Sequence, residues 1–500
     1  MAARRREDET TRGRACARWG WYVAALIVCS LTATGPAGAQ QQLTLPDAIA
    51  LAQKQSLQAR GALRALDAAR DRDRSFGASL LPQVSLSGNA PIYNRSIIPV
   101  LQPDGSTLFR AQQQNQSSLA MRVSQTLPYL GGQLFFQSAL SRLQVIGERS
   151  TQTWSSTPYQ VGITQSLFRS NTAAWSAQEN DITSDVAERQ YLESREDLAV
   201  STSSAFFDFY AAKMQLENAK KNVASNDSLY TLNKGRFDVG KIGENDLQQS
   251  ELTLLRAQIS LDGANLEYDR TLAALRIQLN LPIGAPIDVA VTSEVPSFAP
   301  DTAIAVAQAL RNSSAIRSLD LQDEQARRRV SEARMNTGFG ATITASLGFN
   351  QTGPDMNVVY KDLLQAQQFS MSVSMPVFQW GGRSAQIQAA RADQDRIASN
   401  IQLSREQTVQ DAHFAALQLA QSGRQLKIAA KADTVASSRF DVAKNRYLIG
   451  KIGIDILVQA QVDKDNALLA YIQSLRGYWA AYYRLRRVTL YDFEAEKPIR

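Results

Sequence analysis

The sequence contains few of the residues on which catalysis and metal binding depend. Among its 500 residues there are two cysteines, Cys16 and Cys29, and one histidine, His413. Without a cluster of cysteine and histidine ligands, a transition-metal centre is not expected. The glycines also lack the spacing G-x-x-x-x-G-K-S/T, whose backbone amides bind phosphate. We therefore expect no enzyme, no catalytic residues and no cofactor or metal.

The first 39 residues have the pattern of a secretory signal. Six arginines precede Trp19, a mostly apolar stretch follows over 21–33, and Ala37-Gly38-Ala39 offers the small residues that a signal peptidase cuts. The apolar stretch is shorter than the roughly 20 residues that a membrane-spanning helix needs. We therefore expect residues 1–39 to be cleaved. Both cysteines would leave with them, so the mature protein would have no disulfide.

The charge of the chain gives no sign of a nucleic-acid partner. The formal net charge is +7, and part of this excess comes from the arginines of residues 1–39. No cluster of basic residues with interleaved aromatic residues remains in the rest of the sequence, so nucleic acid is not an expected partner.

Proline is absent from two long stretches, and glycine is nearly absent from their central parts. Residues 159–281 contain no proline, and residues 170–233 contain no glycine. Residues 377–497 again lack proline, and Gly423 is the only glycine within 383–447. Because proline and glycine are the residues that most often interrupt helices, each stretch predicts a helix about 100 Å long.

Both stretches end in nearly the same sequence. Residues 236–243 read RFDVGKIG, and residues 446–453 read RYLIGKIG. Before the first pair of glycines, apolar residues stand seven apart, as in a coiled coil: Phe209, Leu216, Val223, Tyr230 and Phe237. These features predict an internal duplication in which each long helix reverses at its glycine pair. Four half-length helical segments accompany the long ones, over 46–81, 244–280, 301–337 and 454–487.

A two-residue alternation marks the other element type. Residues 341–349 and 369–377 alternate apolar side chains with serine and threonine, and so do 84–87, 118–127 and 159–167. Such strands fit a membrane wall that has lipid on one side and water on the other. Four to six strands cannot close a barrel, so several chains must pool them. Residues 133–168 have no counterpart in the second half, and an added hairpin there would raise the strands per chain from four to six.

Taken together, these features resemble the TolC family of outer-membrane efflux proteins. The residues that carry the resemblance are the turns VGKIG (239–243) and IGKIG (449–453), the strand exit MPVFQWGG (375–382) and the opening segment LTLPDAIALA (43–52). It extends over essentially all of 43–493. The implied fold class is mainly α with a membrane β-barrel. Long coiled-coil hairpins would form a periplasmic α-barrel, and amphipathic strands would contribute to a shared trimeric β-barrel.

The resemblance also implies partners and a site. The chain would be a homotrimer in the outer membrane that extends into the periplasm. It would be a passive export duct of a tripartite efflux or type I secretion system, meeting a periplasmic adaptor protein and, through it, an inner-membrane pump. The adaptor would dock on the turns, at Gly240, Lys241, Gly243, Gly450, Lys451 and Gly453. Rings of Asp246 and Asp455 would narrow the periplasmic entrance, although Asp455 stands one place earlier than the family pattern.

Several alternatives remain open from the sequence alone. The two aspartates would also suit a simple role as charges favoured by the helix dipole. A secreted coiled-coil rod would explain the heptads without the strands, and a pore-forming effector would have both. We expect a signal peptide over 1–39, a first repeat over 40–296 (helix, strands, long helix, tip and return helix) and a second repeat over 297–500. The sequence names neither the cargo nor the class of pump.

Overall fold

The computed structural model describes residues 42–147, 150–291, 296, 298 and 300–499. The expected signal peptide lies outside the described residues. The chain forms two compact units. One contains the chain up to Ala52 together with Thr202–Val295, and the other contains Gln53–Ser201 together with Pro296–Arg500.

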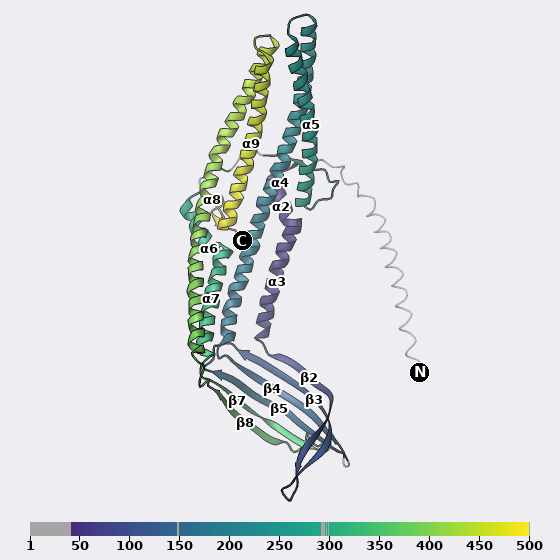
Figure 1. The fold of residues 1–500 in the computed structure, drawn as a ribbon, viewed down its shortest axis with the longest axis vertical. Coiled ribbons are helices and arrows are strands. Elements are labelled where there is room, and N and C mark those ends of the chain that lie inside the picture. Colours follow the sequence, from purple (N-terminus) through teal and green to yellow (C-terminus); the bar gives the residue numbers. More distant parts are fainter. Residues whose placement is uncertain (1–41, 148–149, 292–295, 297, 299, 500) are drawn as a thin grey trace, which may run out of the picture. The chain divides into compact units, whose positions relative to one another are not determined.

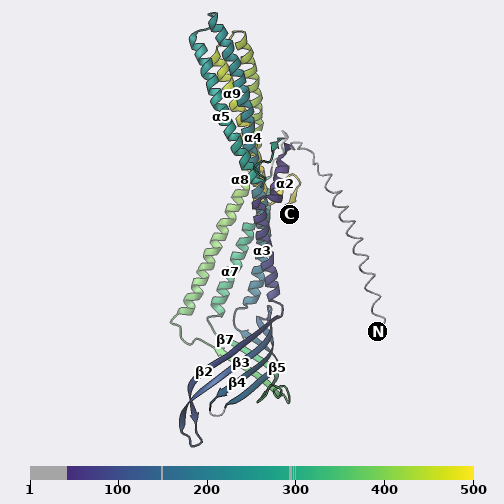
Figure 2. The same cartoon turned by 90° about the vertical axis from the view of Figure 1, so that its right-hand side faces the viewer.

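Two helices of 67 residues are the longest elements (Figures 1 and 2): α4, Thr172–Asp238, and α8, Gly382–Leu448. Each occupies a stretch in which proline and glycine are scarce, so the two predicted long helices are confirmed to within a few residues. A shorter helix follows each of them: α5, Glu244–Gln278, and α9, Ile454–Thr489. These two match the half-length segments predicted after the turns.

The other two half-length segments are each broken at a serine, so the prediction of continuous helices there was wrong. The structure has four helices instead: α2, Leu45–Gln55; α3, Leu57–Ser79; α6, Thr302–Asn312; and α7, Ser314–Met335. Ser56 and Ser313 have extended backbones. The Oγ of Ser56 accepts a hydrogen bond from Ala59 N at 3.0 Å, and that of Ser313 accepts one from Ala315 N at 3.1 Å. Each serine therefore caps a new helix instead of continuing the old one.

Six antiparallel strands form one sheet in the second unit, hydrogen-bonded in the order β2-β3-β4-β5-β7-β8. Their bounds are β2, Gln83–Leu101; β3, Thr107–Leu127; β4, Gly132–Ile146; β5, Thr151–Leu167; β7, Gly340–Gly353; and β8, Leu364–Ser374. Residues 133–168 supply β4 and β5, so the added hairpin considered from the sequence is present. Figures 1 and 2 show that the sheet is curved.

The strand register gives this sheet one apolar and one polar face. Ile163 on β5 stands opposite Leu134 on β4 and Ala345 on β7. The next position, Thr164, stands opposite Gln133 and Thr344. In this part of the sheet the predicted alternation therefore runs across neighbouring strands, with threonine and glutamine on one face and aliphatic residues on the other.

Short strands and buried aromatic residues complete the two units. In the first, β1 (Gln42–Leu43) pairs in parallel with β6 (Asp288–Val289), and the buried ring of Phe209 on α4 lies 5.3 Å from that of Tyr268 on α5. In the second, β9 (Tyr491–Asp492) pairs with β10 (Lys497–Pro498). Among the helices of the described residues, none is both long and apolar enough to cross a membrane.

Candidate functional site

The chain reverses between α4 and α5 through a turn that favours glycine. We call residues 236–247 the first tip. Gly240 has a φ of 69°, in the left-handed region that side chains disfavour. Its N–H donates to Phe237 O at 2.8 Å, and the N–H of Lys241 donates to Arg236 O at 2.8 Å. These two hydrogen bonds form a Schellman motif, which satisfies the last carbonyls of α4.

The second tip, residues 446–457, repeats this geometry between α8 and α9. Gly450 has a φ of 73°, and its N–H donates to Tyr447 O at 2.9 Å. The N–H of Lys451 donates to Arg446 O at 2.9 Å. The two predicted helix reversals are therefore present, and they have the same hydrogen-bonding pattern.

The second glycine of each tip has a different role. Gly243 and Gly453 are the N-cap residues of α5 and α9, with φ angles of −79° and −75° that any residue adopts. A Cβ atom at either position would have no heavy atom within 4 Å. Only the backbone conformations at Gly240 and Gly450 therefore require glycine. The prediction was that each long helix reverses at its glycine pair, and the structure shows that only the first glycine of each pair is needed for the reversal.

Both tips combine exposed apolar and cationic side chains. Val239 and Ile449, which precede the left-handed glycines, are each 67% exposed. Lys241 and Lys451, which follow those glycines, are also exposed. Each tip therefore presents an apolar and a cationic side chain to solvent on either side of its left-handed glycine.

The two predicted gate residues lie in the first turns of the helices that leave the tips. Asp246 is in α5, within the first unit, and Asp455 is in α9, within the second unit. Both are exposed. Neither carboxylate accepts a hydrogen bond or forms an ion pair with a described residue, so neither is a cap, although the helix dipole favours a negative charge at both places.

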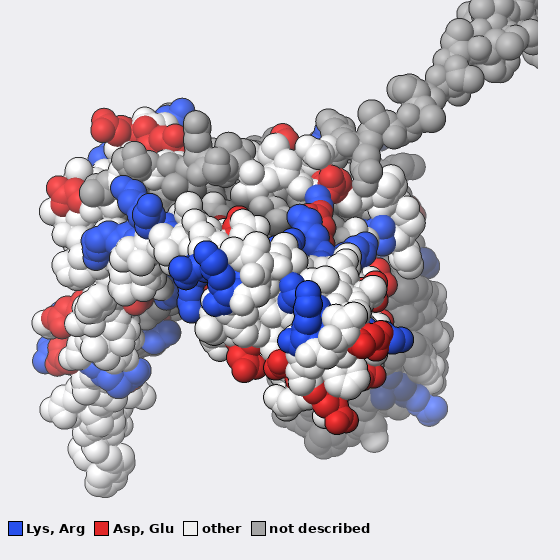
Figure 3. Space-filling view, turned by 90° about the horizontal axis from the view of Figure 1, so that it is seen from above, with Lys and Arg blue, Asp and Glu red and all other residues white. Residues whose placement is uncertain are grey.

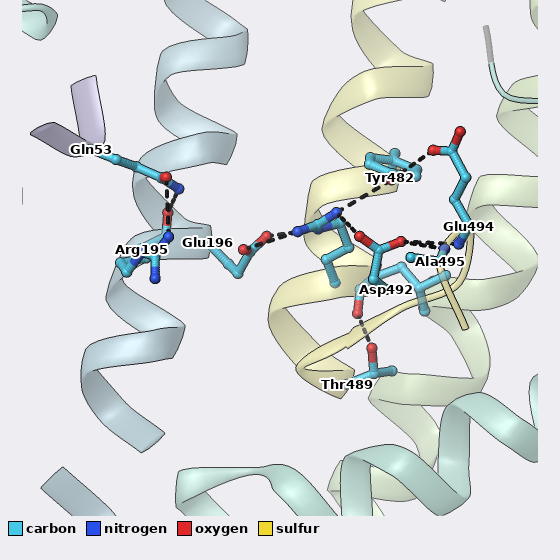
Figure 4. Close-up of polar contacts among 10 residues, drawn as sticks. Gln53, Arg195, Glu196, Tyr482, Thr489, Asp492, Glu494 and Ala495 are labelled. Atoms are coloured by element: carbon cyan, nitrogen blue, oxygen red, sulfur yellow. Dashed lines mark hydrogen bonds and ion pairs between the residues drawn. The ribbon is translucent and has the colours of Figure 1, made fainter. Parts of the chain in front are cut away.

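A buried ionic network joins α4 to α9 and β9 (Figure 4). Arg486 donates from Nε to Glu196 Oε2 at 3.1 Å and from a terminal nitrogen to Asp492 Oδ2 at 2.7 Å. The side chain of Glu196 is only 5% exposed, and that of Arg486 is 20% exposed. Nothing in the sequence pattern pointed to this network, because its members lie far apart in the chain and heptad spacing marks apolar positions only.

Other ion pairs shift the pKa of carboxylates on the helices and short strands. Partial burial raises the pKa of Asp185 on α4, but hydrogen bonds from Arg189 and Arg317, at 2.9 and 2.7 Å, outweigh it and hold the pKa below its ordinary value. In the first unit, the hydrogen bond from Lys213 lowers the pKa of Asp288. These groups fix α7 to α4 and β6 to α4, and they lie outside the tips.

The described residues show neither a group of metal-binding side chains nor, on the face drawn in Figure 3, a uniformly charged surface. Within the described part of the chain, no three His, Cys, Asp or Glu side chains are grouped so that they could hold a metal ion. His413 lies in α8, with its ring 5.6 Å from that of Phe414. On the face of the described residues shown in Figure 3, basic and acidic side chains are intermixed.

Comparisons with known proteins agree with this architecture. Residues 305–489 match the family model described as outer membrane efflux protein. The fold resembles the CmeC outer membrane channel of Campylobacter jejuni (TM-score 0.63, 17% identity, 89% of this chain and 85% of that chain). It also resembles VceC of Vibrio cholerae (0.63, 13%, 89% and 95%) and the open state of the MtrE outer membrane channel of Neisseria gonorrhoeae (0.59, 14%, 89% and 88%). No curated protein matches the sequence.

These findings confirm the resemblance to the TolC family. The chain has the fold of outer-membrane channels, with long helical hairpins and an antiparallel sheet. Its second half matches the outer membrane efflux protein family. The matched family is described as outer membrane efflux protein, CmeC and MtrE are described as outer membrane channels, and VceC is described as an outer membrane protein. These matches support a channel rather than an enzyme, and a location in the outer membrane.

Proposed function

We propose that this chain is the subunit of a homotrimeric outer-membrane channel, which serves as the passive export duct of a tripartite efflux or type I secretion system. The observation that supports this best is the six-stranded sheet. Its edge strands, β2 and β8, each pair on one side only within the described residues. Unpaired backbone groups cost several kcal/mol each in hydrocarbon, so both edges need partner strands from other copies.

The strand count suggests the size of the shared barrel. Three copies of a six-stranded sheet would supply about 18 strands, which lies within the range of outer-membrane barrels. Barrels of this size enclose a water-filled channel. The polar face of the sheet would line that channel, and the apolar face would meet the lipid.

The helical hairpins, the tips and the two sequence repeats also have roles in the proposed channel. The helical hairpins would continue the channel through the periplasm, and the tips would dock on an adaptor that connects them to an inner-membrane pump. Rings of Asp246 and Asp455 would narrow the periplasmic entrance. Residues 1–39 would be the cleaved signal, and 40–296 and 297–500 would be the two repeats.

The oligomeric state is the first test of this proposal. The detergent-extracted protein should be a trimer by native mass measurement. Because the mature sequence would lack cysteine, a pair of introduced cysteines can report the predicted contact between edges. Ser87→Cys on β2 combined with Ser370→Cys on β8, treated with a short bis-maleimide, should give covalent trimers on a denaturing gel.

A second pair of introduced cysteines is the control, because it distinguishes cross-links between chains from cross-links within one chain. Ser87→Cys with Ser141→Cys keeps both thiols on the polar face, but Ser141 lies on the interior strand β4. This pair should react within the chain and give no trimer band. A stable monomer that retains its full strand content by circular dichroism would contradict the proposal and would favour a pore-forming effector.

The tips give the second test. Gly240→Val together with Gly450→Val should strain both turns by about 1–2 kcal/mol each, because β-branched side chains disfavour the left-handed region. Binding of the cognate adaptor, measured with the channel in nanodiscs, should weaken about tenfold or more.

Substitution of the other two glycines is the control. Gly243→Ala together with Gly453→Ala changes positions that have negative φ and open space, so adaptor binding should stay near the wild-type value. If both double variants bind the adaptor equally well, the turn geometry does not determine docking. Trimer size should be unchanged in both variants.

A further inference from the structure

All charged residues in the six strands of the sheet are arginines. They are Arg95, Arg110, Arg122 and Arg142, and the strands contain no aspartate, glutamate or lysine. The strand register places these four arginines on different faces and in different parts of the sheet. Arg95 and Arg142 pair with Gln113 and Ser117 on the apolar face, and Arg110 lies beyond the last β3 residue that pairs with β4. In the part of β3 that pairs with β4, Arg122 is therefore the one charged residue on the polar face.

Three neighbouring strands hold Arg122 in place. Its guanidinium carbon lies 4.6 Å from the centre of the Phe135 ring on β4, which is 8% exposed. Phe135 in turn lies over Gly162 on β5, directly opposite it in the register. A Cβ atom at Gly162 would overlap the Phe135 ring, so the absence of a side chain there makes the room for that ring.

The charge of Arg122 is not neutralised within the chain. Its guanidinium has no hydrogen bond or ion pair with another described residue, and the residue is partly exposed on the polar face. The contact with the Phe135 ring favours one position of the guanidinium without removing its charge.

We propose that Arg122 gives the barrel segment of the duct a preference for anions, so that it favours solutes that carry carboxylate, phosphate or sulfonate groups. The inference rests on the proposed trimeric channel, in which three copies of Arg122 would form a ring on the lumen wall. A ring of one sign raises the local concentration of the opposite ion. Among the described residues, those that the register places at the level of Arg122 on the neighbouring strands, Ser85, Gln137 and Gln160, are neutral, so none of them opposes its charge.

Ion selectivity of single channels tests this directly. In a planar bilayer with a KCl gradient, Arg122→Gln and Arg122→Met should shift the chloride-to-potassium permeability ratio toward potassium by about two- to threefold at low salt. Arg122→Lys keeps the charge and should keep the wild-type ratio. Arg142→Gln removes an arginine from the apolar face of the same sheet and should leave the ratio unchanged.

The results of these recordings distinguish a failure of the Arg122 inference from a failure of the channel proposal. If the trimer forms no discrete conducting state, the proposed function itself fails. If the channels conduct normally but Arg122→Met has the wild-type ratio, Arg122 only covers the Phe135 ring and the inference is overturned. An equal shift in Arg122→Lys and Arg122→Met would also overturn it, because packing rather than charge would then set the ratio.

Discussion

Replacing Arg486 with methionine should lower the melting temperature of the helical region by several degrees, measured by circular dichroism in detergent. Methionine has similar bulk but no charge, so the Glu196 carboxylate would remain buried without its partner, and Asp492 would also lose a hydrogen bond. Removing one member of a buried ion pair typically costs about 3–5 kcal/mol, because an uncompensated charge stays in a poorly solvated place.

The adjacent arginine provides the control. Arg487 also donates to a carboxylate of α4, Asp197, at 3.1 Å, but these two side chains are 43% and 57% exposed. Exposed pairs contribute about 0–1 kcal/mol, so Arg487→Met should change the melting temperature little. Combining Glu196→Gln with Arg486→Met should recover part of the lost stability. Equal effects of the two single arginine variants would show that burial does not determine the contribution of these pairs.

Much of the helical architecture could be predicted from residues that are missing. Proline and glycine are the main interrupters of helices, so their absence over 170–233 predicted α4 almost to its ends. The left-handed conformations of Gly240 and Gly450 were also predictable. Glycine takes this conformation readily, and the same glycine-containing sequence follows each long helix.

The breaks at Ser56 and Ser313 were not predictable from pattern alone. Serine occurs inside many helices, and whether it caps a new helix depends on packing elsewhere in the fold. The strand β4 was obscured for a different reason. Phe135 stands on the polar face and interrupts the alternation, and its place there depends on Gly162, which lies on another strand.

The candidate site was predictable in its turns but not in its charged contacts. The sequence places Asp246 and Asp455 near the tips because both follow a glycine pair closely. The pairing of Arg486 with Glu196 depends on how α9 packs against α4, and no local sequence pattern predicts this packing. Similarly, the location of Arg122 on the polar face depends on the strand register. That register is defined only when the strands are aligned with one another.

The second large effect concerns the proposed periplasmic gate. Asp246→Ala together with Asp455→Ala should weaken the block of single-channel conductance by divalent or trivalent cations, added on the periplasmic side, by about tenfold or more. Three copies of each carboxylate around a narrow entrance would repel one another and concentrate cations. The absence of hydrogen-bond partners for both carboxylates among the described residues fits that role better than helix capping. The same variant should also shift the chloride-to-potassium permeability ratio of the open channel toward chloride, opposite to the shift expected for Arg122→Met.

The control for the gate is a neighbouring acid in the same helical turn. Glu244 accepts a hydrogen bond from Gln248 at 3.0 Å and stands at the start of α5. If helix-dipole charge were the whole role of these acids, Glu244→Ala would act like the aspartate variants, whereas the gate proposal predicts block close to wild type. Asp246→Ala alone should have a larger effect than Asp455→Ala alone, because only Asp246 keeps the spacing of the family resemblance. Undiminished block in the double aspartate variant would mean that the constriction is formed by other residues.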